Sequence, residues 1–216
     1  MEQTRIQGKH AGLQRDQILR TALALVDRDG VSGLSMRRLA RELGIEAMTL
    51  YHHVKNKDAL EDALVEHVLA EYVTAESIHR IDGRVSWQDA LKGYARDFHH
   101  ALESHPGAVA LFATRSAITS RNLRALEMLI GTLVNAGFTS AQALRIVHAT
   151  AIAVIGQHAT ARHDVGADLE SFGEDLPLVR EAFGTDWSDL EARVNFMVSS
   201  LVAGYDRYLS GTSGLG

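Results

Sequence analysis

The stretch SMRRLARELGIEAMTLYHHVKNK, residues 35–57, decides the fold of the N-terminal part of the chain. Within it, Ala40, Gly44 and Leu50 have the residue types and the order that a helix-turn-helix requires. A small residue lets two helices cross closely, a glycine turns the chain at positive φ, and an apolar residue anchors the second helix on the first. Val54 closes the predicted small core. The spacing alone is equally compatible with a helical hairpin inside an ordinary bundle.

The second predicted helix leaves polar side chains and one aromatic residue exposed, namely Glu46, Thr49, Tyr51, His52 and His53. The major groove of B-DNA is wide enough to admit an α-helix, and the base edges in it present hydrogen-bonding groups. We therefore predict that this helix reads DNA.

The composition favours helices throughout the chain. Only two of the 216 residues are proline, and alanine and leucine recur, so long helices can run without interruption. Apolar residues at helical spacing predict helices over residues 14–29, 36–43, 47–53, 56–78, 87–104, 108–117, 121–136, 140–162, 175–183 and 187–209, with a loop over 163–174. Ser35 and Asn56 are the predicted caps of the second and fourth of these helices. The predicted fold class is all-α.

The chain divides into two predicted domains. Residues 1–60 form a helix-turn-helix DNA-binding domain, with residues 1–12 expected to be flexible. Residues 61–216 form a larger helical domain, with residues 210–216 expected to be disordered. The first domain carries ten Lys or Arg against seven Asp or Glu, a net charge of +3, whereas the second carries −8. A basic segment on an acidic body is the asymmetry expected when the small domain meets phosphate.

Several classes of protein are excluded by what the sequence lacks. There is no cysteine, which excludes disulfides and thiolate metal sites. No stretch of about 18 apolar residues occurs, and the start MEQTRIQGKHAG lacks the apolar core of a signal peptide, so we expect a cytoplasmic protein without a membrane partner. No nucleophile elbow, glycine-rich phosphate loop or metal-ligand motif is present, and we expect no enzyme.

The helix-turn-helix stretch resembles the TetR family of bacterial repressors nearly residue for residue, through Leu39-Ala40, Leu43-Gly44-Ile45, Thr49-Leu50-Tyr51, His53-Val54-Lys55-Asn56-Lys57 and Leu60. The resemblance is strong over about residues 15–65. It is weaker beyond, where Trp87-Gln88, Ala113-Thr114-Arg115 and Asn135-Ala136-Gly137-Phe138 are similar to the tetracycline-repressor-like subgroup.

The resemblance implies a three-helix DNA-binding domain joined by a helix to a larger ligand-binding and dimerisation domain. It implies a repressor that a small-molecule effector releases from a palindromic operator. A transcriptional activator and a ligand-independent DNA-binding protein are the alternatives, and a small-molecule-processing enzyme is a remote one.

The candidates for DNA contact are of two kinds. The base-reading candidates are Arg37, Ala47, Met48 and Thr49; those for phosphate or sugar are Tyr51, His53, Lys55 and Lys57, with His52 also on the exposed side of the recognition helix. The guanidinium of Arg37 can pair with a guanine edge, and the resemblance implies a base contact by arginine at this position. Ala47 and Met48 stand where the tetracycline repressor has Gln-Pro, so we expect a different operator. The alternative for each lysine is a solvated surface charge.

The candidates for ligand contact in the second domain are Trp87, Tyr94, Phe98, Phe112, Arg115, His148 and Gln157. Further aromatic residues considered for a cavity wall are Phe138, Phe172, Phe183, Phe196 and Tyr205. Aromatic residues at helical spacing are otherwise ordinary core, and the resemblance is what implies a cavity between the helices. We expect a mostly apolar ligand with a few polar contacts.

Neither a metal nor another cofactor is expected. The resemblance places Leu111 and Gly156 where the tetracycline repressor has a metal-binding histidine and a glutamate, while His148 matches another histidine. A tetracycline sensor is therefore not expected. The eleven histidines, including His99 on one helical face with Glu103, are interpreted as structural or surface residues, because no HExxH-like pattern is present.

A homodimer is expected through the helices near residues 140–162 and 187–209. The interface candidates are Ala149, Ala153, Gly156, Val198, Leu201 and Val202. The first three are small enough for close helix packing and the last three supply apolar area, with burial inside one subunit as the alternative. The helix over residues 56–78 would act as a lever between the two domains.

Overall fold

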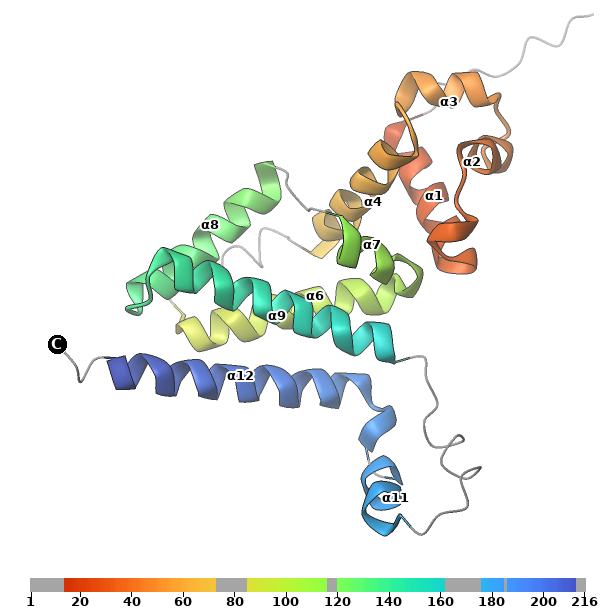
Figure 1. Cartoon of the computed structure of the whole chain (residues 1–216). Coiled ribbons are helices and arrows are strands. Elements are labelled where there is room, and N and C mark those ends of the chain that lie inside the picture. Colours follow the sequence, from red (N-terminus) through yellow and green to blue (C-terminus); the bar gives the residue numbers. More distant parts are fainter. Residues whose placement is uncertain (1–13, 73–84, 116–119, 162–175, 185, 213–216) are drawn as a thin grey trace, which may run out of the picture.

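The computed structural model describes residues 14–72, 85–115, 120–161, 176–184 and 186–212. Regular structure in these ranges is helical, which confirms the all-α prediction (Figure 1). A small N-terminal head is followed by a larger helical body, and α4 connects the two.

The head consists of α1 (Arg15–Asp29), a 3-10 turn η1 (Val31–Gly33), α2 (Met36–Glu42) and α3 (Ala47–His53). α2 begins where Ser35 Oγ accepts a hydrogen bond from the Arg38 N–H at 3.3 Å. The turn between α2 and α3 passes through Gly44 at φ +67°, which glycine adopts without strain. Leu39 and Leu50 are fully buried between the helices. The predicted helix-turn-helix is confirmed.

The connecting helix α4 (Lys57–Tyr72) belongs to both parts of the molecule. It begins where Asn56 Oδ1 accepts a hydrogen bond from the Ala59 N–H at 2.8 Å, which confirms the predicted cap. Most of its apolar residues are buried, and Leu60 and Leu64 completely so. They pack against α1 of the head and against α6, α7 and α8 of the body, so α4 fixes the head on the body.

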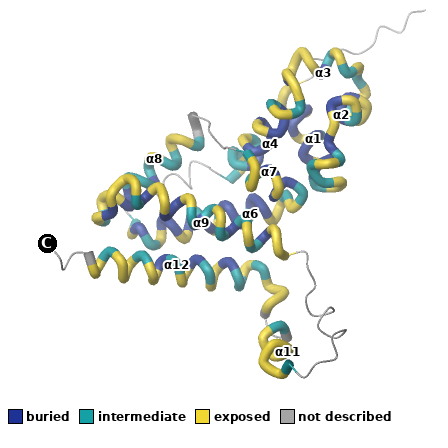
Figure 2. Tube along the Cα trace, viewed as in Figure 1, coloured by how far each residue is buried: buried dark blue, intermediate teal, exposed yellow. Residues whose placement is uncertain are grey.

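The body consists of α6 (Trp87–Ser104), η2 (Pro106–Ala108), α7 (Val109–Thr114), α8 (Ser120–Asn135), α9 (Ser140–Thr160), α11 (Pro177–Gly184), η3 (Asp186–Ser188) and α12 (Leu190–Thr212). α9 and α12 lie side by side in opposite directions, and α6 packs against both (Figure 1). Buried side chains lie where these helices meet, whereas much of α12 is exposed (Figure 2). None of the helices in the described ranges combines the length and the apolar character needed to cross a membrane.

The ends of the helices differ from the predictions at a few places. α12 begins at Leu190 because Asp189 Oδ1 accepts a hydrogen bond from the Ala192 N–H at 2.9 Å and caps the helix there. Residues 210–212 continue α12 instead of belonging to a disordered tail. α7 is shorter than predicted, since the backbone is extended at Arg115. The predictions for residues 1–12, 73–78, 163–174 and 213–216 lie outside the described residues.

A second contact joins head and body at η2. The Gly107 N–H donates to Asp27 Oδ1 at 3.2 Å, and His105 Nδ1 lies 2.9 Å from Asp27 Oδ2. His105 Nε2 is also 3.5 Å from the carboxylate of Glu71, near the end of α4. Gly107 approaches α1 so closely that a Cβ atom there would meet the carbonyl oxygen of Val26 at 2.1 Å. The end of α1, the end of α4 and the segment after α6 therefore meet at one junction.

Replacing Gly107 by alanine tests this junction. We expect Gly107→Ala to lower the free energy of unfolding by about 1–3 kcal/mol, because backbone must move to admit the methyl group. Urea denaturation measures the change. Gly131→Ala is the matched control: Gly131 lies within α8 with open space at the Cβ position, so alanine should leave stability unchanged or raise it by up to about 1 kcal/mol. A Gly107→Ala chain as stable as the native one would contradict the close approach.

Candidate nucleic-acid interface and ligand-binding region

The recognition helix α3 buries one side and presents the other to solvent. Its open side carries Met48, Tyr51, His52 and His53. Leu50 is completely buried, and Ala47 and Thr49 are half-buried. Met48 is 67% exposed, which a methionine serving the core would not be. The helix thus offers a mixed apolar and polar surface to an external partner.

Two neighbouring arginines of α2 have different environments. Arg38 is fixed inside the head, because its Nη2 donates to Asp29 Oδ2 at 2.6 Å and its Nη1 to the Gly33 carbonyl at 3.2 Å. Arg37 is exposed and makes no hydrogen bond or ion pair with a described residue. Arg38 therefore holds α2 on α1, and Arg37 is available to a base or a phosphate.

The two lysines after α3 also differ. Lys55 is exposed. Lys57 is half-buried, and its Nζ donates to the Val31 carbonyl at 3.3 Å and lies 3.5 Å from Glu61 Oε1. Lys57 does begin α4, whose N-terminal amides favour a phosphate. Its ammonium group has partners within the head, so Lys55 offers the more accessible cation.

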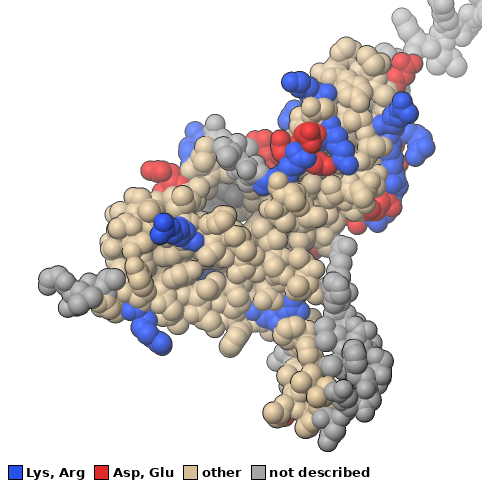
Figure 3. All heavy atoms as spheres, viewed as in Figure 1, with Lys and Arg blue, Asp and Glu red and all other residues tan. Residues whose placement is uncertain are grey.

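The space-filling view shows how charge is distributed over the two parts of the molecule. Lys and Arg side chains gather over the head, and Asp and Glu side chains lie where the head meets the body (Figure 3). Such a distribution gives the far end of the head the more favourable potential for a polyanion.

Three of the predicted ligand residues form an aromatic cluster between α6 and α7, namely Tyr94, Phe98 and Phe112. The rings of Tyr94 and Phe98 stack with centroids 6.2 Å apart, and Phe112 meets Phe98 edge-on at 5.4 Å. Burial raises the pKa of the Tyr94 phenol to about 12, so its hydroxyl group stays neutral at physiological pH. The aromatic cluster thus combines a large apolar surface with one hydrogen-bonding group.

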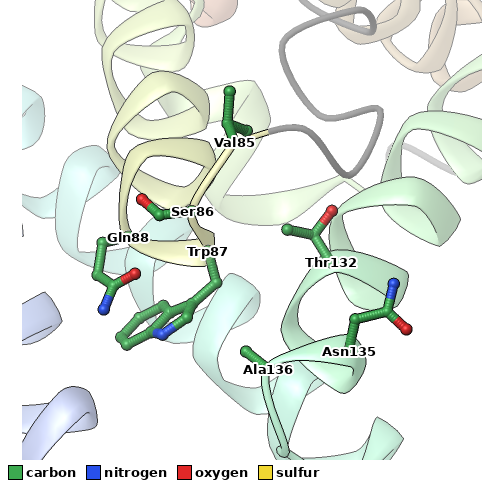
Figure 4. A pocket seen from close by; sticks show the side chains of 7 residues that line it. All are labelled: Val85, Ser86, Trp87, Gln88, Thr132, Asn135 and Ala136. Atoms are coloured by element: carbon green, nitrogen blue, oxygen red, sulfur yellow. The ribbon is translucent and has the colours of Figure 1, made fainter.

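Trp87 lies at a different place, beside a pocket of about 340 Å³ between the start of α6 and the end of α8 (Figure 4). The pocket is lined by Val85, Ser86, Trp87, Gln88, Thr132, Asn135 and Ala136. The Trp87 indole also packs edge-on against Phe138 with ring centroids 5.2 Å apart. Trp87 therefore serves the core as well as the pocket wall.

Arg115, another predicted ligand contact, bridges α7 and α4 in this structure. Its Nη2 donates to Asp58 Oδ1 at 2.7 Å and to Glu61 Oε2, and its Nη1 donates to Asp62 Oδ1 at 3.3 Å. The hydrogen bond to Asp58 and the three carboxylates together raise the pKa of the guanidinium, which stays charged. Arg115 follows α7 directly, so these contacts fix the end of α7 to the first turns of α4.

The two other polar candidates, Gln157 and His148, both belong to α9. Gln157 bridges α9 and α12, since its Oε1 accepts a hydrogen bond from Arg193 Nε at 3.0 Å and its carbonyl accepts one from Arg193 Nη2 at 3.0 Å. His148 is exposed on α9. The partner of Gln157 lies 36 residues away in the chain, so no local pattern indicates this pairing.

The predicted dimer residues divide into buried and accessible ones. Val198 and Val202 are buried within the single chain; Ala149, Ala153 and Leu201 are half-buried, and Gly156 is exposed. The sequence analysis did not assign the two most exposed apolar side chains of these helices, Ile152 at 55% and Phe196 at 78%, to an interface.

Phe196 points to solvent, not into a cavity as considered from the sequence. The spacing of the apolar residues in α12 could have predicted the exposure of Phe196. Val194, Val198 and Val202 form the buried stripe of α12 at steps of four, and Phe196 stands midway between two of them. At 100° per residue, that position lies on the opposite side of the helix.

A helix-turn-helix head with an exposed recognition helix, carried on an all-helical body, defines a DNA-binding transcriptional regulator. Residues 18–64 match the family model of bacterial regulatory proteins of the tetR family, and residues 81–199 match the tetracyclin repressor-like C-terminal domain. The chain belongs to the TetR family, as the resemblance in the sequence indicated.

Known relatives extend over nearly the whole chain. An HTH-type transcriptional regulator of Saccharopolyspora erythraea is 31% identical over 94% of this chain and 87% of the relative. The class E tetracycline repressor protein of Escherichia coli is 32% identical over 92% and 93%, respectively. Among solved structures, a variant of TetR from Acinetobacter baumannii AYE in complex with minocycline has a TM-score of 0.70 at 28% identity, covering 91% of this chain and 98% of that one.

Arg37→Ala tests the base-reading role of the exposed arginine. We expect it to weaken binding to the operator by about 1–3 kcal/mol and to leave binding to random duplex DNA nearly unchanged, because a bidentate contact to a base edge is lost. Fluorescence anisotropy on both duplexes at one salt concentration measures the difference. Equal losses on the two duplexes would rule out base reading by Arg37.

Lys55→Ala is the matched comparison, since Lys55 is also an exposed cation of the head. It should weaken binding to both duplexes alike and reduce the slope of log K against log salt by about one unit, as the loss of one phosphate contact requires. An unchanged slope would identify Lys55 as an ordinary surface charge.

Proposed function

We propose that the protein is a repressor that leaves a palindromic operator when a small molecule binds to its body. The observation that carries this proposal is the contact of Arg115 with Asp58, Glu61 and Asp62. Arg115 stands three residues after Phe112 of the aromatic cluster, and the three carboxylates stand in the first turns of the helix that follows the recognition helix. A ligand that moves α7 would therefore move α4 and the head.

On DNA, the proposed division of work follows the exposure of the side chains. The base edges would be faced by Arg37, Ala47, Met48 and Thr49. Phosphate or sugar would be met by Tyr51, His53 and Lys55. Met48 offers apolar contact, for instance to a thymine methyl group, and makes no hydrogen bond. A regulator that binds operator DNA would act in the bacterial cytoplasm.

The proposed ligand is mostly apolar and binds at the aromatic cluster. Tyr94 would provide its hydrogen bond, because Arg115 and Gln157 have protein partners in this structure. The tetracycline repressor relatives support a small-molecule effector for a body of this fold. Leu111, which is 1% exposed, and Gly156 offer no metal ligand, so a magnesium–tetracycline complex is not the proposed effector.

Release of DNA would follow from linkage between the two sites. The dimer has one conformation whose head spacing fits the operator and another whose spacing does not. A ligand that binds the second more tightly lowers operator affinity by the difference between its binding free energies for the two conformations. Operator DNA must then lower the affinity for the ligand by the same factor. Such coupling needs a defined distance between the two heads of a dimer, and the dimer must therefore be rigid.

The proposed dimer forms through the outer faces of α9 and α12. Phe196 and Ile152 are large apolar side chains that solvent covers in the single chain. Ala149, Ala153 and Gly156 are small and accessible enough to let helices of two chains approach closely. Burying these faces in a symmetric pair would place two recognition helices at half-sites one turn of DNA apart, roughly 34–36 Å, or further for longer spacings.

Arg115→Ala tests the coupling. With DNA flanking the protein's own gene and a panel of apolar metabolites, a gel shift should show binding by the native chain and release by at least one compound. We expect Arg115→Ala to bind that compound but to need at least about tenfold more of it for half-release, because the link from α7 to α4 is lost.

Arg115→Lys keeps the positive charge but lacks the planar guanidinium that can donate to several carboxylates at once. Its compound concentration for half-release should lie between those of the native chain and Arg115→Ala. Release of the native chain by no compound would reject the sensor role and leave DNA binding intact. If a reporter gene under the operator is expressed in the native strain and loses that expression when the gene for this protein is deleted, the protein is an activator.

Phe196→Glu tests the dimer. A charge in the centre of an apolar interface should shift the chain from dimer to monomer in analytical ultracentrifugation and weaken operator binding. Leu123→Glu is the control, because Leu123 is an exposed apolar residue of α8, at 48%, outside the proposed interface. Dimers of unchanged stability in Phe196→Glu would place the interface elsewhere.

A further inference from the structure

A group of polar side chains on α6 serves neither the head nor the aromatic cluster. His99, His100 and Glu103 lie close together on α6, and His158 of α9 packs against His99. His99 is 2% exposed and His158 is 7% exposed, whereas Glu103 is exposed and His100 is half-buried. We call these four residues the histidine group.

The atoms that can bind a metal converge in this group. One ring nitrogen each of His99 and His100 and a carboxylate oxygen of Glu103 lie within 4.8 Å of one another. His100 Nδ1 is 3.5 Å from Glu103 Oε2, and His99 Nε2 is 4.0 Å from it. The longer distance exceeds a hydrogen bond, and His99 Nε2 has no hydrogen-bond partner among the described residues. A buried polar atom without a hydrogen bond is unfavourable, so a partner for His99 Nε2 is expected.

His158 fixes the ring of His99. The distance between His99 Nδ1 and His158 Nε2 is 2.9 Å, so one of these nitrogens donates a hydrogen bond to the other. When His99 Nδ1 donates, the neutral ring has its lone pair on Nε2, beside the carboxylate of Glu103. Two acceptors facing each other repel unless a cation lies between them. Histidine ligands of metals commonly donate their other ring N–H to a fixed partner, as His99 would to His158.

The charges around the group favour a cation. Burial lowers the pKa of His99 and lowers that of His158 to about 4. The carboxylates of Asp189 and Glu191, at the start of α12, lie close enough to act on His99. Arg193, which donates a hydrogen bond to the Gln157 carbonyl, acts on His158 with the opposite charge.

We propose that His99 Nε2, His100 Nδ1 and the carboxylate of Glu103 bind a divalent transition-metal ion, for which Zn²⁺ is the best match. Two imidazoles and one carboxylate are a donor set that zinc favours, whereas magnesium and calcium prefer oxygen donors only. Metal–ligand bonds of roughly 2.0–2.2 Å require the three atoms to approach one another slightly. His100 and Glu103 can rotate to do so, because both side chains are accessible to solvent, at 44% and 60%. The fourth coordination position stays open to water or to an outside ligand.

This site was not expected from the sequence, which lacks a metal-ligand motif. His158 is 59 residues from His99 along the chain, so only the fold shows that a buried partner orients the ring. The site is distinct from the aromatic cluster, since His99 pairs with His158 of α9 whereas Phe98 meets Phe112 of α7.

Isothermal titration of the full, tag-free chain with ZnCl₂ tests the proposal. We expect one zinc ion per chain, and visible d–d absorption when Co²⁺ takes its place. Glu103→Gln should raise the dissociation constant at least about tenfold, and His158→Gln, which removes only the orienting partner, by about 10–100-fold. The double variant His100→Gln/Glu103→Gln changes only accessible side chains and should abolish binding at this site without affecting the fold.

His148→Gln is the control, because it removes an exposed histidine elsewhere on α9. It should leave stoichiometry and affinity unchanged. The proposal is overturned by a chain that binds no zinc. It is equally overturned by a double variant that binds zinc as tightly as the native chain, since other histidines would then be responsible.

Discussion

The carboxylate of Glu61 imposes a condition on the whole arrangement. Glu61 is 6% exposed on α4, among apolar residues that pack on both head and body. A buried charge is tolerated only when it is paired and hydrogen-bonded, and removing one partner of such a pair typically costs about 3–5 kcal/mol. Arg115 donates to one oxygen of Glu61, and Lys57 lies 3.5 Å from the other. Because Arg115 belongs to the body, Glu61 has this hydrogen-bonded partner only when α7 lies against α4, and without it Lys57 alone would remain beside the carboxylate.

Helix α6 of the body carries two chemically different surfaces. Tyr94 and Phe98 of α6 stack toward α7, whereas His99 faces α9 and pairs with His158. Successive side chains of a helix point about 100° apart, so one helix can serve an apolar site and a nitrogen-rich site without overlap. Both surfaces belong to the helix that leads into the junction with the head after α6.

Local features of the fold were predictable from the sequence, and long-range pairings were not. The turn at Gly44 and the caps at Ser35 and Asn56 each depend on residues a few positions apart, and they occur as predicted. The partners of Arg115 lie 53–57 residues away on another helix, so its bridge to α4 leaves no local signal in the sequence. For Gln157 the same holds, with Arg193 36 residues away. A polar side chain shows its type in the sequence but not its partner.

Steric fit at the junction limits how such regulators can be recombined. Gly107 touches the backbone of α1 at Val26, and its N–H donates to Asp27. A head grafted from another regulator would dock on this body only if its first helix ended with the same backbone path and an acceptor at the position of Asp27. New operator specificity can therefore arise readily by changes within α3, whereas exchange of whole heads must preserve a match at residues that touch neither base nor effector.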